Sequence, residues 1–487
     1  MSLLNQQKNQ HLFWRAGFGP AAEQLKDIAI ATPHQLYKAL EKASSKKPRF
    51  INVADNYLQG LYMGIEDAGR QQKRKELTAD ERKMIQKKQR ESIRNLNLAW
   101  LGEMIKSSAQ LREKMAFFWH GHFACRNLNI FYQQQLLDII RRHALGNFRD
   151  MLHEVSKSAA MINFLNNNQN RKDHPNENFA REVMELFTLG RGNYAEHDIK
   201  DAARAFTGWG ANVQGEFIFR RFQHDAGSKT VLGNTGNLQG DEVLDILLEQ
   251  KQTAKFITQK VYRFFVNEVP DETKIEWLAD RFYQSNYEIS KLMEDIFTSD
   301  WFYDLKNIGS IIKSPVELLA GIQRILPMEV QNDEALLLLQ RLLGQVLFYP
   351  PNVAGWPGGK SWIDSSSLVM RMRIPMLIND VDELNINPKD DDDQMMGRNE
   401  NTPKLKNNGM GKSGRPIQAD INWPAYMAYF ESIPKEKLQE AITVLLLQTK
   451  TGVNPELIRK YMDSSGRENF IKSATFQLMS TPEYQMC

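Results

Sequence analysis

A hydrophobic period of 3.6 residues recurs along most of this chain and constrains its fold more than any other feature. Apolar side chains return every three or four positions, which is the spacing of one face of an α-helix. Between Gly215 and Gly240 the period changes, and the run Phe217 to Phe219 among glycines predicts a small hairpin or ordered loop. We therefore expect a mainly α protein, a large multi-helix domain with a small β excursion near 215–240. The helices are expected at 132–145, 146–156, 176–189, 198–207, 241–250, 253–265, 272–284, 288–298, 314–325 and 333–345.

A polar tract of low complexity interrupts this helical pattern near the C-terminal end. The chain has 487 residues, which is more than one ordinary hydrophobic core fills. Residues 387–414 contain four consecutive aspartates and then a run of lysine, asparagine and glycine, a composition that does not support a packed core. We expect a helical main domain over 1–386, a flexible polar insertion over 387–414, and a C-terminal helical segment over 415–487 that packs back on the main domain.

The composition excludes several classes of protein. Lys and Arg total 62 against 59 Asp and Glu, and a net charge of +3 gives no general attraction to nucleic acid. Two cysteines are too few for a disulfide framework or a cysteine-based zinc site. We find no apolar run of about 18 residues, so we expect no membrane span. We also find no signal peptide at the N-terminus, which makes the cytoplasm the default expectation.

The segment NENFAREVMELFTLGRGNYAEHDIKDAARAFTGW, residues 176–209, is the densest in polar groups. On a helix Asn178, Glu182 and Glu185 follow the spacing i, i+4, i+7 and share one face. Two carboxylates and an amide could hold a divalent metal ion, or could pair a general acid with a general base. Arg181 lies one turn from Glu177 and from Glu185, so intrahelical salt bridges are the alternative interpretation.

Histidines supply the other candidate groups. His120 and His122 are two residues apart, which on a helix separates their directions by about 200° and prevents both from binding one metal ion. That objection weakens if the helix ends near His120, and buried structural histidines remain the alternative. The loop His224-Asp225-Ala226-Gly227-Ser228-Lys229 has mixed charges and a flexible backbone, which suit contact with an anion or a metal, but also suit an ordinary Asx turn.

The segment from Tyr349 to Trp362 carries three prolines and two tryptophans. Tryptophan rings beside a glycine turn can stack on a sugar ring or a base, or can fill the core. The rings concerned are those of Trp356 and Trp362.

Several segments of this sequence also resemble those of a known family. HLFWRAGFGP, LREKMAFFWHGHF, NENFAREVMELFTLGRGNY, DIKDAARAFTGW, HDAGSKTVLG, IKSPVELL and PPNVAGWPGGKSW together resemble the bacterial family catalogued as domain of unknown function 1800, from His11 to the Pro-Glu-Tyr at 482–484. The family implies no mechanism. Its motif positions fall, in this sequence, on His120, His122, Asn176, Glu177, Asn178, Arg181, Glu182, Glu185, Arg204, Trp209, His224, Asp225, Lys229, Asn352, Trp356 and Trp362.

So many polar signature residues favour a functional site. The resemblance also implies a partner, because members of the family are often encoded beside sulfatase-like proteins of unassigned family 1501, which commonly carry twin-arginine signals. The chain would then stay in the cytoplasm or be exported bound to such a partner.

Our leading hypothesis is an enzyme with a buried polar site, guessed to be a hydrolase, that could bind a divalent metal. A non-catalytic accessory or assembly partner, whose polar cluster fixes the fold, is the alternative, and a carbohydrate-binding or carbohydrate-cleaving protein is a further one. The expected catalytic residues are Glu182, Glu185, His224 and Asp225; the expected substrate-binding residues are Asn178, Arg181, Arg204, Lys229 and Trp356; the expected metal ligands are His120, His122, Glu182 and Glu185.

Overall fold

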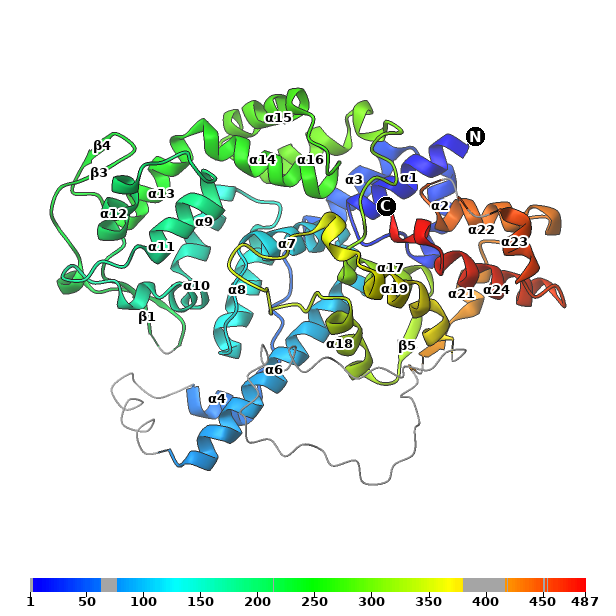
Figure 1. The fold of residues 1–487 in the computed structure, drawn as a ribbon, viewed down its shortest axis with the longest axis horizontal. Helices are drawn as coiled ribbons and strands as arrows, with labels where there is room; N and C mark the ends of the chain where they lie inside the picture. The colour runs from blue at the N-terminus through cyan, green and yellow to red at the C-terminus, as the bar shows by residue number, and fades with distance from the viewer. Residues whose placement is uncertain are drawn as a thin grey trace. The chain divides into compact units, whose positions relative to one another are not determined.

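The regular structure of the chain is mainly helical, as the hydrophobic period predicts (Figure 1). The structure is a computed structural model that describes residues 3–62, 77–212, 214–379, 417, 419–449, 452 and 454–487. The helices expected between 132 and 345 are all present, with ends that differ from the predicted ones by at most three residues. Among the described residues, no helix combines the length and the apolar composition that crossing a membrane requires.

The chain divides into two units, and each is described here by itself. Unit 1 is made of Met1–Leu36, Tyr303–Val346 and Gly358–Cys487, and unit 2 of Tyr37–Phe302 and Leu347–Pro357. The expected insertion at 387–414 and both of its boundaries lie outside the described residues, so this part of the domain prediction stays a prediction.

Unit 2 contains the motif-rich segment. Its helices pack through apolar stripes, and α14 and α15 run alongside each other (Figure 1). The helical elements are α3 (Pro33–Ser44, which begins in unit 1), α4 (Asn56–Tyr62), α6 (Ala79–Lys106), α7 (Gln110–His122), α8 (Ile130–His143), α9 (Phe148–Lys157), α10 (Ala159–Phe164), η2 (Asn167–Gln169), α11 (Glu177–Glu182), η3 (Val183–Thr188), α12 (Glu196–Ala205), η4 (Arg221–Gln223), α13 (Gly240–Glu249), α14 (Lys251–Phe265), α15 (Glu272–Gln284), α16 (Ile289–Phe297) and η5 (Asp300–Tyr303, which ends in unit 1).

Nearly all of the surface of helix α7 is buried, so this helix belongs to the core of unit 2. Every residue from Gln110 to His120 is buried, including charged ones. The carboxylate of Glu113 accepts hydrogen bonds from Trp100, Arg112 and Arg141 at 2.9 to 3.1 Å. A buried charge is tolerated only when it is paired in this way.

In the described part of unit 2, the named strands form two short hairpins. The strand expected at Phe217–Phe219 is β2, and it pairs antiparallel with β1 (Trp209–Ala211), which the sequence did not predict. β3 (Lys229–Val231) pairs with β4 (Asn234–Gly236). The second hairpin packs on α12 (Figure 1).

Unit 1 joins the two ends of the chain to a middle segment. Residues 311–313 pair with residues 485–487: Ile311 N donates to Cys487 O at 3.2 Å, and Lys313 N donates to Gln485 O at 2.8 Å. The other elements are α1 (Leu3–Arg15), η1 (Ala22–Gln24), α2 (Leu25–Ile30), α17 (Pro315–Ile325), α18 (Asp333–Leu342), η6 (Gly359–Trp362), α19 (Ser365–Ile378), α21 (Trp423–Met427), η7 (Lys435–Lys437), α22 (Leu438–Leu446), α23 (Pro455–Lys460), α24 (Arg467–Met479), η8 (Pro482–Gln485) and the strand pair β5 (Met328–Val330) with β6 (Ala419–Ile421).

Candidate functional site

The helix that carries the two candidate glutamates changes its hydrogen-bond pattern halfway. The side chain of Asn176 caps α11 by accepting from Asn178 N at 3.0 Å. After Glu182 the chain continues as one π-helical turn, η3, in which Leu189 N donates to Met184 O at 2.9 Å, five residues back. Single π turns inside helices are frequent at functional sites.

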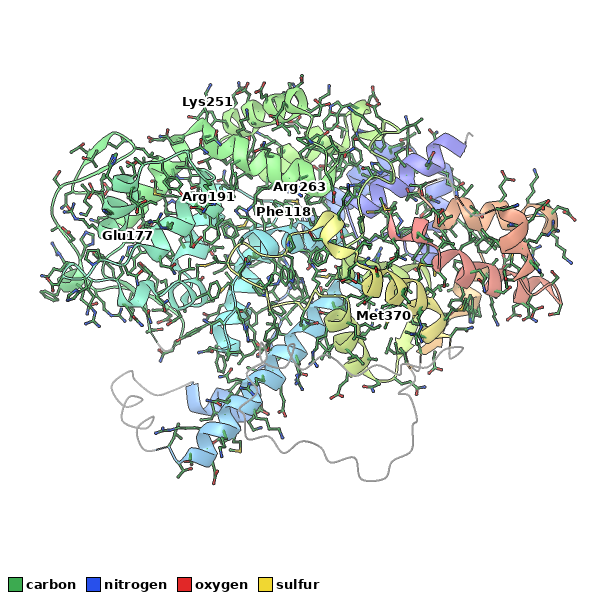
Figure 2. All side chains as sticks on the ribbon, viewed as in Figure 1. Phe118, Glu177, Arg191, Lys251, Arg263 and Met370 are labelled. Carbon is green, nitrogen blue, oxygen red and sulfur yellow. The ribbon has the colours of Figure 1, made fainter. Side chains whose placement is uncertain are left out.

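Glu185 lies in this π turn and is held on both oxygens. Its Oε2 accepts a short hydrogen bond from the hydroxyl of Tyr194, and its Oε1 lies 3.2 Å from Nε of Arg191. Burial, and next the hydrogen bond to Glu185, raise the pKa of Tyr194 to about 12, so the phenol stays protonated and donates. Arg191 itself is exposed and is labelled in Figure 2.

Glu182 has a different environment although it lies only three residues earlier. Its side chain is half-buried, and within the described residues it has neither a hydrogen bond nor an ion pair. Burial, and next the repulsion from Glu185, raise the pKa of Glu182, while Arg181 acts against this rise. The two carboxyls therefore differ: Glu185 is held by Tyr194 and Arg191, whereas Glu182 takes up a proton more readily than an ordinary glutamate.

The last carbonyls of this helix, which have no following helical amide to bind them, meet two basic side chains. Nε2 of His122 lies 3.2 Å from Phe187 O, and Nζ of Lys260 lies 3.1 Å from Nδ1 of His122 and 3.3 Å from Leu186 O. Because the ammonium of Lys260 can only donate, Nδ1 of His122 accepts and Nε2 carries the proton.

Burial sets the protonation of this pair. It lowers the pKa of His122 well below the ordinary value, with repulsion from Lys260 as the second cause. It also lowers the pKa of Lys260 to about 8. His122 is therefore neutral near pH 7, and Lys260 titrates closer to neutrality than an ordinary lysine.

His120 faces a different part of unit 2. Its Nε2 accepts from Phe348 N at 3.2 Å, and its ring meets those of Trp100, Phe348 and Trp356 at 5.0 to 5.6 Å between centroids. Burial lowers its pKa to about 3, so it stays neutral. Phe348, which makes this bond, has a φ of 69°, a conformation that is uncommon for a residue other than glycine.

The loop that begins at His224 is tied down on α12 by ion pairs. Arg204 donates from Nε to Asp225 Oδ2 at 2.7 Å and from a terminal nitrogen to Asp225 Oδ1 at 3.3 Å. Its other terminal nitrogen reaches Asp201 Oδ1 at 2.9 Å. This pairing is the first cause of the lowered pKa of Asp225. Lys229 is buried and donates to Gly227 O at 2.9 Å.

His224 has one nitrogen engaged and one without a partner. Its Nδ1 lies 2.9 Å from Thr207 O, so this nitrogen carries the proton in the neutral ring. Its Nε2 is buried and has no hydrogen-bond partner in the described part of the chain. This nitrogen keeps its lone pair available for a ligand.

The remaining candidates are placed as follows. Asn178 donates to Leu165 O at 3.1 Å, and Arg181 pairs with Glu177 and with Glu196 but not with Glu185 (Glu177 is labelled in Figure 2).

The structure thus places His122 against a carbonyl of the π turn that carries Glu185. His120 and the loop at 224–229 make their contacts with other residues of unit 2. No group of three or more His, Cys, Asp and Glu side chains that could hold a metal ion occurs among the residues that the structure describes. The ring nitrogens of His122 and Nε2 of His120 are already hydrogen bonded. Neither histidine offers a free lone pair there, so the histidine part of the expected ligand set does not fit a metal.

Sequence reasoning missed three residues that shape this region. Arg191 lies between Gly190 and Gly192, and Tyr194 follows these glycines, so both come soon after the helix, where their side chains can reach back to a carboxylate. Lys260 lies on α14, where Gln252, Phe256 and Lys260 form one stripe at i, i+4, i+8. Gln252 donates to Leu189 O at 3.1 Å, so this stripe binds the carbonyl end of the π turn. The i, i+8 spacing of Gln252 and Lys260 on one face of α14 was the available signal.

The comparisons with known proteins give a family and no function. Neither a curated protein nor a solved structure matches the chain. The model of one family, described as "Protein of unknown function (DUF1800)", matches residues 11–486, nearly the whole length. The match spans the π turn, the histidine helix and the loop at 224–229 described above. The chain therefore belongs to the DUF1800 family of proteins of unknown function.

Proposed function

We propose that Glu182 transfers a proton in a hydrolytic reaction and that Glu185 is the charged carboxylate beside it. One observation carries the proposal: Glu182 is half-buried and has no partner among the described residues, whereas Glu185 is held by Tyr194 and Arg191. Two neighbouring carboxyls in unlike environments are the usual arrangement of an acid and an anion in hydrolytic sites. A raised pKa brings the acid closer to the pH at which proton transfer is efficient.

The π turn supports the same assignment. It begins directly after Glu182, contains Glu185, and ends in carbonyls to which His122 and Lys260 are hydrogen bonded. An element that is anchored on one side keeps its other side in a fixed geometry. Glu182 and Glu185 therefore occupy a rigid support, as acid–base chemistry requires.

The test is a screen of chromogenic esters, phosphates, sulfates and glycosides with the wild type and two glutamine variants. Glu182→Gln should lower the rate by about 10²–10⁴-fold, the usual contribution of a general acid or base. Glu196→Gln is the matched control, because Glu196 is an exposed surface carboxylate that pairs with Arg181, and it should retain activity. If activity is found and Glu182→Gln retains it, Glu182 is not the proton-transferring group. Activity on the glycosides would support the hypothesis of a carbohydrate-cleaving protein, since glycoside hydrolysis also uses a pair of carboxyls.

A second candidate function, an accessory or assembly partner, is favoured by a different observation. Four candidate residues form hydrogen bonds within the chain through their side chains: Arg204, Asp225, Lys229 and His120. Polar residues engaged in this way fix a fold and need no substrate. The expected partner is a sulfatase-like protein with an export signal, which would also decide the compartment. Gel filtration of the two purified proteins, alone and mixed, tests this proposal: two unchanged peaks at micromolar concentration would exclude a stable complex.

A bound divalent metal remains a separate proposal. The carboxylate oxygens of Glu182 have no hydrogen-bond partner among the described residues and could coordinate the ion. The carboxylate of Glu185 could coordinate it as well, in addition to its contact with Arg191. Elemental analysis of the purified chain, compared with that of Glu182→Gln, tests it: a metal that is present in both at equal content does not bind at Glu182.

A further inference from the structure

Three signature segments have no part in the proposed function, and they meet in unit 1. They are HLFWRAGFGP at the N-terminal end, IKSPVELL in the middle and the Pro-Glu-Tyr of residues 482–484. Lys313, from the middle segment, is fully buried between the rings of Trp14 and Tyr484, with Nζ 3.7 and 3.9 Å from their centroids. Its Nζ donates to Tyr484 O at 2.6 Å.

Arg371 lies against this cluster from α19, one residue after Met370, which is labelled in Figure 2. Its side chain is fully buried. One terminal nitrogen, Nη1, donates to Lys313 O at 2.9 Å and lies 3.5 Å from Oε1 of Gln485. Its Nε and its other terminal nitrogen, Nη2, are buried without a hydrogen-bond partner in the described chain.

These two unpartnered nitrogens form one edge of the guanidinium. Nε and Nη2 donate in parallel, about as far apart as two oxygens of one carboxylate, sulfate or phosphate. Nε2 of Gln485 is a third buried donor without a partner, on the amide whose oxygen faces the same arginine. A charged donor edge that is buried and unmatched is destabilising, so an acceptor bound at this edge would stabilise the fold.

The charge balance of unit 1 points to an anion. Its buried charged side chains in the described ranges are Arg15, Lys313, Arg324 and Arg371 on the basic side and Glu317 on the acidic side. Burial lowers the pKa of Arg371 to about 10, and the attraction of Glu317 opposes this change only in part. A buried cation of this kind is stabilised by a negative charge at hydrogen-bond distance.

We infer that unit 1 binds a small oxyanion on the Nε and Nη2 edge of Arg371, with the amide of Gln485 as an additional donor. The ligand class is a carboxylate, sulfate or phosphate, because each has two oxygens on one centre. A halide has the charge without the oxygen pair and binds this edge poorly.

Arg324 provides a matched control within the same unit. It is a buried arginine, but its corresponding edge is filled by the protein: Nε donates to Gly19 O at 2.8 Å and Nη2 donates to Gln24 Oε1 at 3.3 Å. Arg371→Lys and Arg324→Lys therefore make the same chemical change, and both can lower stability. Only the first removes an edge that is open to a ligand.

The experiment uses the full chain after exhaustive dialysis. Acid-unfolded protein is analysed for released anions by ion chromatography, and melts are recorded with acetate, sulfate or phosphate against chloride at equal ionic strength. We expect a released oxyanion at about one per chain or, with an empty site, a rise in Tm of about 5–10 °C at a hundredfold excess over Kd. Arg324→Lys should keep this response, Gln485→Ala should weaken it, and Arg371→Lys should lose it. An equal rise in Arg371→Lys, or neither a released oxyanion nor any rise in the wild type, would overturn the inference and leave water as the partner of this edge.

Discussion

Replacing glutamate by glutamine should have opposite effects on stability at two positions of unit 2. Glu113 is fully buried and accepts five hydrogen bonds from Trp100, Arg112 and Arg141. Glutamine has the same shape, but one of its terminal atoms is a donor that would face the guanidinium donors. Glu113→Gln thus leaves Arg141, which is also buried, without its buried counter-charge. Breaking a buried pair from one side costs about 3–5 kcal/mol.

The substitution at Glu182 removes a charge that has no partner in the described structure. Because the folded pKa of Glu182 is raised, the folded chain holds this proton more tightly than the unfolded chain does. Stability that depends on the proton is present below the ordinary glutamate pKa, about 4.3, and is lost as the pH rises through the raised folded pKa. Glu182→Gln should therefore match the wild type in acid and exceed it at pH 7.

Thermal melts followed by circular dichroism, from pH 4 to pH 8, measure both effects. Glu113→Gln should lower the Tm by about 6–20 °C at pH 7, given about 2–4 °C per kcal/mol for a unit of this size. Glu182→Gln should raise it, and the difference from wild type should shrink toward pH 4. A Glu182→Gln variant that melts below the wild type at pH 7 would refute the argument, because it would show that this carboxylate has a partner.

Two further substitutions test the surroundings of the site. Lys260→Met should remove a pH dependence: since the pKa of Lys260 is lowered from 10.5 to about 8, the wild type should gain stability over the variant as the pH rises through that range, and a constant difference in urea titrations would contradict the assignment. Asp225→Asn should cost about 1 kcal/mol at pH 7 and speed proteolysis in the loop at 224–236, because it removes the charge paired with Arg204. This loss should disappear as the pH falls through the lowered pKa of Asp225, and unchanged cleavage at pH 7 would show that the pair does not hold the loop.

The helices were predictable because their signal is local. A stripe of apolar residues and a cap such as Thr78, which accepts from Glu81 N at 3.3 Å, are read directly from neighbouring residues. The divergence of His120 and His122 followed from the same helical geometry. Strands of three residues carry almost no such signal, and the pairing of β5 with β6 joins segments that are far apart in the chain.

The sequence placed the candidate glutamates on one helix, but it did not predict their contacts. The spacing of Glu182 and Glu185 indicated a pair of carboxyls, but an α-helical spacing assumes a regular helix, and the π turn breaks that assumption. Which carboxyl is anchored depends on Tyr194 and Arg191, and which carbonyls are bound depends on Lys260. These contacts arise from how loops and helices pack, which a hydrophobic period does not encode.

The π turn has a consequence for how this segment tolerates insertions and deletions. A π turn holds one residue more than an α-helical turn, so a chain shortened by one residue between Val183 and Thr188 could close the helix with regular hydrogen bonds. Because this deletion removes only the extra residue, the residues after it would keep nearly their present directions, and Gln252 could still donate to Leu189 O. The carbonyls of Leu186 and Phe187 lie in the last turn, where no following helical amide binds them, so Lys260 and His122 would remain their partners. This segment should therefore tolerate the loss of one codon better than a regular α-helix would.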